Sequence, residues 1–114
     1  APFGLIHKRA LFLSADGNEL RGEDTLSGKT VTNASVSFHL HPNVQASLVE
    51  AGNSVLLKFG KSAGWRFRAS NTDITLKPSL YFDHGVRRQA QQIVLAADHN
   101  GPETIIKWRF AQED

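Results

Sequence analysis

The feature that most limits the fold of this chain is a two-residue alternation of apolar and polar side chains. Every second residue of segment 34–41 is apolar, and the same alternation recurs in segments 44–50, 54–59, 65–69 and 103–111. Successive side chains of a β-strand point to opposite faces of the sheet. The pattern therefore predicts a series of strands, each with one buried face.

Turn-forming dipeptides separate these segments. Asp16-Gly17 and Asn100-Gly101 supply residues that accept the positive φ of tight hairpin turns. Strands recur about every 8–12 residues, which is typical of a sandwich or barrel. We expect an all-β fold, an antiparallel β-sandwich of nine or ten strands. The expected strands are 4–14, 19–27, 34–41, 44–50, 54–59, 65–69, 74–78, 80–83, 89–97 and 103–111.

The length of 114 residues suits one domain with one core, and 40% of the residues are apolar. We therefore expect residues 1–114 to form a single β-sandwich domain. The chain has no methionine and runs from Ala1 almost directly into strand-like sequence, so we expect it to be part of a larger parent chain. No apolar run approaches the roughly 18 residues that a membrane span needs, and we expect no membrane contact. The absence of cysteine fits either the periplasm or the cytoplasm.

Several kinds of catalytic site are missing from the sequence. It contains no phosphate-binding glycine loop, nucleophile elbow or HExxH zinc helix, and without cysteine it has no thiol nucleophile. No carboxylate pair, the neighbours Glu23 and Asp24 included, stands out as a glycosidase acid and base. Tyr81 is the one tyrosine, and its segment 80–82 is typical of a packed strand. We assign no catalytic residue.

His39 and His41 form the most distinctive short feature. Residues that are two positions apart on one strand lie on the same face. The two imidazoles could therefore converge on a metal ion, with His7, Asp83 or His84 as the third ligand. The simpler interpretation, which we favour, is two solvated histidines at a strand end, and we expect no complete metal site and no cofactor in this chain. A polar contact to a ligand or a neighbouring domain is the third possibility.

Arg66 and Arg68 alternate with Trp65 and Phe67. If the rings are buried, the two guanidinium groups face solvent, where they could bind carboxylate or sulfate groups of an acidic sugar chain. The segment 87–88 and the pair Lys107 and Arg109 could extend this surface, although an ordinary solvated sheet face is the simpler interpretation. Nucleic acid is a poorer partner, because exposed aromatic rings do not interleave with the basic residues. The weak candidates for ligand binding are His39, His41, Arg66 and Arg68.

The order of several segments resembles the C-terminal β-domain of heparinase II/III-like proteins. These segments extend over nearly the whole chain. They are 3–9, 11–17, 20–24, 38–44, 64–67, 87–89 and 92–95. The resemblance implies that the chain is the C-terminal β-sandwich of a bacterial polysaccharide lyase, in which an N-terminal α/α toroid precedes the β-domain. Such lyases cleave uronate-containing glycans, glycosaminoglycan or alginate among them, by β-elimination.

In that family the catalytic tyrosine lies in the toroid, and a histidine-containing segment linked to metal binding lies before the part matched here. The resemblance therefore implies a structural, substrate-flanking module that is inactive alone. Its partners would be the toroid and, through the parent enzyme, an acidic polysaccharide. Two alternatives remain open: a stand-alone carbohydrate-binding module, and a purely architectural sandwich that docks on a neighbouring domain.

Overall fold

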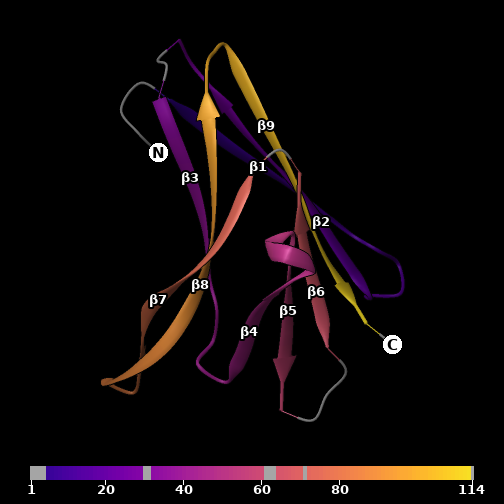
Figure 1. The fold of residues 1–114 in the computed structure, drawn as a ribbon, viewed down its shortest axis with the longest axis vertical. Coiled ribbons are helices and arrows are strands. Elements are labelled where there is room, and N and C mark those ends of the chain that lie inside the picture. The colour runs from indigo at the N-terminus through magenta and orange to yellow at the C-terminus, as the bar shows by residue number, and fades with distance from the viewer. Residues whose placement is uncertain (1–4, 30–31, 61–63, 71, 114) are drawn as a thin grey trace.

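Two antiparallel sheets form the fold in the computed structural model, which describes residues 5–29, 32–60, 64–70 and 72–113 (Figure 1). The larger sheet has six strands in the order β1-β2-β9-β6-β5-β4, and the smaller has three in the order β3-β8-β7. The elements are β1 (Ile6–Leu13), β2 (Glu19–Ser27), β3 (Thr32–His39), β4 (Val44–Val49), the 3₁₀ turn η1 (Glu50–Gly52), β5 (Ser54–Phe59), β6 (Trp65–Ala69), β7 (Asp73–Asp83), β8 (Val86–His99) and β9 (Glu103–Gln112).

The all-β sandwich predicted from the alternation is confirmed, with nine strands in the described residues. Segments 74–78 and 80–83, expected as two strands, form the single strand β7. Pro78 lies inside β7, and it is tolerated because β7 is an edge strand, where a missing N–H costs no ladder bond. Segment 89–97 belongs to the longer strand β8, so the strand prediction holds there against helical propensity. Residue 4, which belongs to an expected strand, and residues 61–63 and 71, which lie between expected strands, are outside the described residues.

The core lies between the two sheets. Its fully or nearly fully buried residues are Val36, Ile93 and Leu95 from the smaller sheet and Val55, Leu57, Phe67, Ile106 and Trp108 from the larger. Phe38 of β3 reaches across, with its ring centroid 4.9 Å from that of Trp108 and 5.4 Å from that of Phe67. Tilted and edge-on ring pairs of this kind stabilise a core by about 0.5–1.5 kcal/mol each beyond the area they bury.

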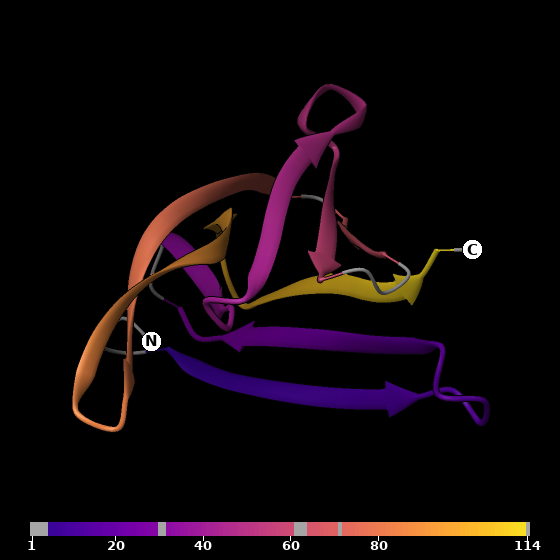
Figure 2. The ribbon, with the colours of Figure 1, turned by 90° about the horizontal axis from the view of Figure 1, so that it is seen from below.

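Two parts of the molecule extend beyond this core. β1 lies at one edge of the larger sheet, and all eight of its residues are exposed (Figure 2). The distal half of the β7–β8 hairpin also projects, and Leu80, Tyr81 and Phe82 are 55%, 37% and 65% exposed. The expectation that residues 80–82 form a packed strand is therefore wrong: the strand forms, but the larger sheet does not extend far enough to cover it.

Gly22 of β2 lies directly opposite Trp108 of β9, and the indole occupies the space that a side chain would need. A Cβ atom on Gly22 would lie 2.2 Å from Cζ2 of Trp108 and 2.6 Å from its Cη2. The absence of a side chain at this position therefore lets the indole lie flat against the β2 backbone.

We expect Gly22→Ala to lower the free energy of unfolding by about 1–3 kcal/mol, because the buried ring must move to admit the methyl group. Chemical denaturation followed by tryptophan fluorescence measures the change. Gly64→Ala is the matched control, since a Cβ there meets no atom closer than 3.4 Å. Equal stability of the two variants would contradict the account of the Gly22–Trp108 contact.

Candidate functional site

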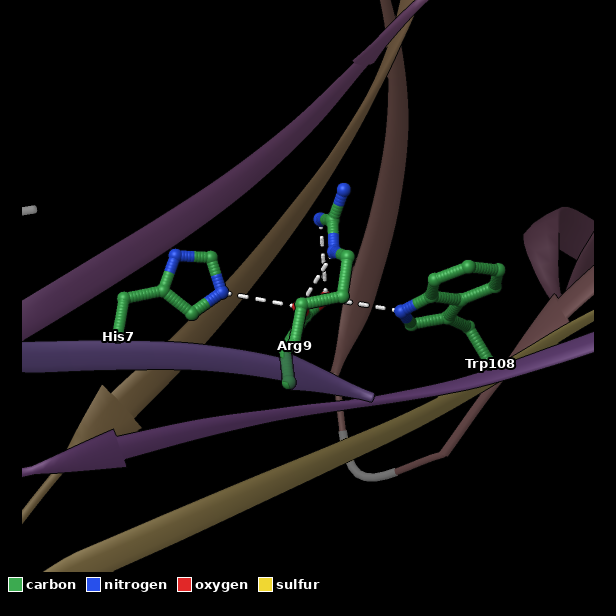
Figure 3. A network of polar contacts seen from close by, with 4 residues as sticks. His7, Arg9 and Trp108 are labelled. Carbon is green, nitrogen blue, oxygen red and sulfur yellow. Dashed lines mark hydrogen bonds and ion pairs between the residues drawn. The ribbon is translucent and has the colours of Figure 1, made fainter. Parts of the chain in front are cut away.

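The most elaborate polar cluster in the described residues surrounds Asp24 on β2, which is completely buried (Figure 3). Oδ1 of Asp24 accepts hydrogen bonds from Nε of Arg9, at 2.6 Å, and from Nε2 of His7, at 2.9 Å. Oδ2 accepts from Nη2 of Arg9, at 3.1 Å, and from the indole N–H of Trp108, at 2.8 Å. The carboxylate thus has four donors, which is what a buried charge requires.

The cluster follows from the register of three strands. Arg9 lies directly opposite Asp24 in the β1–β2 pair, and His7 lies one inward-facing position away. The alternation of β2 points Gly22, Asp24 and Leu26 inward, so a carboxylate occupies a core position. The sequence analysis considered Asp24 only together with Glu23, as carboxylates that do not stand out as a glycosidase acid and base. The alternation along β2 places Asp24 at an inward-facing position between Gly22 and Leu26, and this is the signal that could have identified it as a buried charge.

Arg9 also links the two sheets. Its guanidinium carbon lies 4.8 Å from the ring centroid of Phe38 on β3 and 5.5 Å from that of Trp108 on β9. Both distances are within the range of a cation–π interaction. The Arg9 side chain therefore holds an otherwise exposed edge strand against the carboxylate and against an aromatic ring of the opposite sheet.

Burial raises the pKa of Asp24, but the hydrogen bonds from Arg9, His7 and Trp108 outweigh it, and the net pKa lies below the ordinary value of 3.8. A carboxylate that is ionised and fully hydrogen-bonded contributes to stability and offers no proton-accepting site to a substrate. The cluster is therefore structural: it joins β1 to the sandwich.

The predicted arginines lie on the outer face of the larger sheet, where the alternation placed them. Phe67 between them is fully buried. Nη1 of Arg66 and Nη2 of Arg68 both donate to Oε1 of Glu50, and Nε of Arg66 donates to Glu113. Glu50 reaches this position with a left-handed backbone, at φ 54°, which is strained for a residue with a side chain. Arg66 and Arg68 are thus brought together, and each is paired with at least one carboxylate.

The predicted histidines lie at the end of β3: His39 is its last residue, and His41 is two residues beyond it. Leu40, between them, still bonds to β8, since its N–H donates to the carbonyl of Gln91. The His41 ring lies 5.0 Å from the ring of Tyr81 and 6.5 Å from that of Phe59, and its Nδ1 accepts from the Asn43 N–H. His7, proposed as a third metal ligand, binds Asp24 instead.

Among the described residues there is no group of three or more histidine or acidic side chains that could hold a metal ion. The side chain of Asp83, another proposed ligand, lies outside the described ones. In the same part of the chain, no helix is long and apolar enough to cross a bilayer.

Asp24→Asn should lower the free energy of unfolding by about 2–3 kcal/mol, because the ion pair with Arg9 is lost and one of the two acceptor oxygens becomes an NH2 group that cannot accept from its present donors. Glu23→Gln is the matched control: Glu23 precedes Asp24 in β2, its side chain is 42% exposed, and its Oε1 lies 3.8 Å from Nζ of Lys107. We expect that control to change stability by less than about 0.5 kcal/mol. Urea unfolding of both variants tests the comparison, and similar losses would mean that the cluster adds nothing.

The same pair of proteins should show a pH dependence. Since the pKa of Asp24 is lower in the folded chain, its stabilising contribution is complete above the unfolded value of about 3.8 and disappears as pH falls through the folded value. The stability difference between the wild-type chain and Asp24→Asn should therefore be constant near neutral pH and shrink below about pH 4. A difference that grows on acidification would contradict the assigned direction.

The chain is similar in sequence and in fold to known proteins. Residues 1–109 match the model of the family described as heparinase II/III-like, C-terminal. The chain is 39% identical over 124 residues to FtsZ-localized protein C of Caulobacter vibrioides, a match that covers 97% of this chain and 21% of that protein. The fold is similar to that of heparan sulfate lyase HepC from Pedobacter heparinus, with a TM-score of 0.82 and 13% identity. It is also similar to a heparinase III, with a TM-score of 0.79 and 10% identity.

The matches to the two solved structures cover 97% and 96% of this chain but only 18% of the length of each of those proteins. The chain thus spans about a fifth of the length of the proteins it matches. At such low identity the two lyases show the fold alone. The family match extends over almost the whole chain, and the resemblance seen in the sequence is confirmed: this chain belongs to the heparinase II/III-like C-terminal domain family.

Proposed function

We propose that the domain is the C-terminal β-sandwich module of a polysaccharide lyase, in which it supports and flanks the substrate without cleaving it alone. The observation that carries the proposal is strand β1, whose eight residues are all exposed. Ile6, Leu11 and Leu13 have between 59% and 70% of their surface accessible. A long edge strand with this much apolar surface is suited to docking on a neighbouring part of a larger protein.

The chemistry of the described residues supports a module that flanks the substrate and leaves the cleavage to residues elsewhere in the parent chain. β-Elimination beside a uronate carboxylate requires a base, an acid for the leaving oxygen, and donors that stabilise the developing negative charge. Asp24 and His7 bind each other, and the ring nitrogens of the buried His99 contact Oγ1 of Thr104 and the carbonyl of Gly28. These groups are engaged in holding the fold. In the proposal the reacting groups come from elsewhere in a longer chain, together with any divalent metal.

The substrate-flanking role falls to the outer face of the larger sheet, where Arg66 and Arg68 lie. Guanidinium groups form bidentate contacts with carboxylate and sulfate, so this face suits the acidic polymers that the proposed enzyme would cleave. His39 and His41 lie near the end of the smaller sheet. His41 is less suited to the role, because its ring contacts those of Tyr81 and Phe59.

The 114-residue chain alone should release no unsaturated uronate product from heparan sulfate or alginate, whereas a longer parent chain that contains it should. The new double bond absorbs ultraviolet light, so a continuous absorbance assay measures both. Activity of the 114-residue chain would refute the division of labour. A parent that is inactive on every uronate polymer tested would refute the lyase assignment.

A second candidate function is favoured by the sequence comparison. FtsZ-localized protein C is 39% identical, about three times the identity shared with the two lyase structures. On this alternative, the domain belongs to a protein that localises with FtsZ. A fluorescent fusion of the parent should then form a band at the division site that disappears when FtsZ is depleted. A diffuse signal in the presence of FtsZ would contradict the alternative.

A further inference from the structure

Three arginines on three neighbouring strands lie directly opposite one another on the outer face of the larger sheet. Arg68 of β6 is paired in register with Arg109 of β9, and Arg109 is paired with Arg21 of β2. Directly opposed residues of antiparallel strands share a face, with Cβ atoms about 4.5–5.5 Å apart. We refer to Arg68, Arg109 and Arg21 as the arginine row. Only Arg68 of the row was among the predicted ligand-binding residues; Arg109 was considered as an extension, and Arg21 was missed.

This arrangement is unfavourable without an anion. Like charges directly opposite each other on a sheet destabilise the strand pair. Nε of Arg21 lies 3.3 Å from Glu19, and Nη2 of Arg68 lies 3.1 Å from Glu50, so each outer member of the row has a carboxylate on one side. Among the described residues Arg109, the central member, has no ion pair. The row therefore leaves its positive charge concentrated at the middle.

The row lines a hollow of about 540 Å³ in the sheet surface. The hollow is bordered by Phe12 of β1, which lies opposite Arg21 and continues the row, and by Lys107, Ser70 and Glu23. Four of the lining residues are cationic and one is anionic. The 52% exposed ring of Phe12 provides an apolar surface beside the charges. A cationic row that ends on an aromatic ring suits a ligand with both acidic groups and ring faces.

We propose that the arginine row binds a linear acidic glycan that carries sulfate or carboxylate groups on consecutive sugar residues. Neighbouring strands are about 4.8 Å apart, so the Cα atoms of the three arginines repeat at roughly that interval across the sheet, and their long side chains can reach acidic groups on successive residues of a linear polymer. Acidic side chains on one face of an extended peptide repeat at about 6.6 Å and fit the row less well. Single-stranded nucleic acid requires several stacking rings, and the row offers one.

The inference rests on the proposed function for the kind of polymer that reaches the domain. It goes beyond that function by assigning the contact to Arg68, Arg109 and Arg21. The two can fail separately: a parent without lyase activity whose arginine row still binds the glycan would refute only the enzyme assignment. A lyase whose row binds no glycan would refute only this inference.

The test measures binding of a heparin-derived octasaccharide to the folded 114-residue chain by isothermal titration calorimetry at low ionic strength. We expect Arg109→Gln to weaken binding about tenfold, and Arg109→Lys, which keeps the charge without the planar fork, to have an intermediate effect. Arg87→Gln is the matched control, because it removes the same charge from an exposed arginine of the smaller sheet. The control should bind within twofold of the wild-type chain.

Two further measurements separate the inference from general charge effects. Polyglutamate and single-stranded DNA of equal charge should bind at least tenfold more weakly than the octasaccharide. In the absence of ligand, Arg109→Gln should melt at or above the wild-type temperature, because it removes repulsion from the row; Arg21→Gln provides a second variant if Arg109→Gln does not fold. Equal losses for Arg109→Gln and Arg87→Gln, or equal binding of the three polyanions, would overturn the inference.

Discussion

The position of Trp108 connects the apolar core of this domain to Asp24, the one fully buried carboxylate among the residues that the structure describes. One face of the indole lies where a Gly22 side chain would be, and the rings of Phe38 and Phe110 approach it edge-on. Its N–H donates to Asp24, which in turn holds Arg9 and the edge strand β1. A tryptophan needs a partner for its N–H when it is buried. Here that requirement couples the packing between the two sheets to the attachment of the strand at the edge.

The sequence was sufficient to predict which residues form strands, because the alternation is regular and the turns are marked by Asp-Gly and Asn-Gly. The inward positions of β3, Ala34, Val36 and Phe38, were read correctly for the same reason. The division of β7 was wrong because Pro78 is normally a strand breaker, and its tolerance depends on edge position, a property of the sheet order. The exposure of Tyr81 likewise depends on how far the opposite sheet extends.

The candidate sites were harder to predict because they depend on register between strands distant in sequence. Arg66 and Arg68 were found from local alternation within one strand. Arg21 and Arg109 are 88 positions apart, and nothing in either local sequence shows that they are directly opposed. The bond between His7 and Asp24 has the same origin, since a hairpin joins the two residues across 17 positions. The periodicity within one strand predicts which face a residue occupies, but only the register between strands decides which residues lie opposite it.

The attachment of β1 has a consequence for the dynamics of the domain. None of its residues is buried, so little hydrophobic free energy opposes its separation from β2. What remains is one backbone ladder, the bonds from His7 and Arg9 to Asp24, and the cation–π contacts of Arg9 with Phe38 and Trp108. Separation of β1 would leave the rest of the sandwich with most of its core, because the buried cluster draws no residue from that strand. The edge of the larger sheet is therefore a unit that can open independently of the core, and β2 would then present its own ladder groups to a different strand.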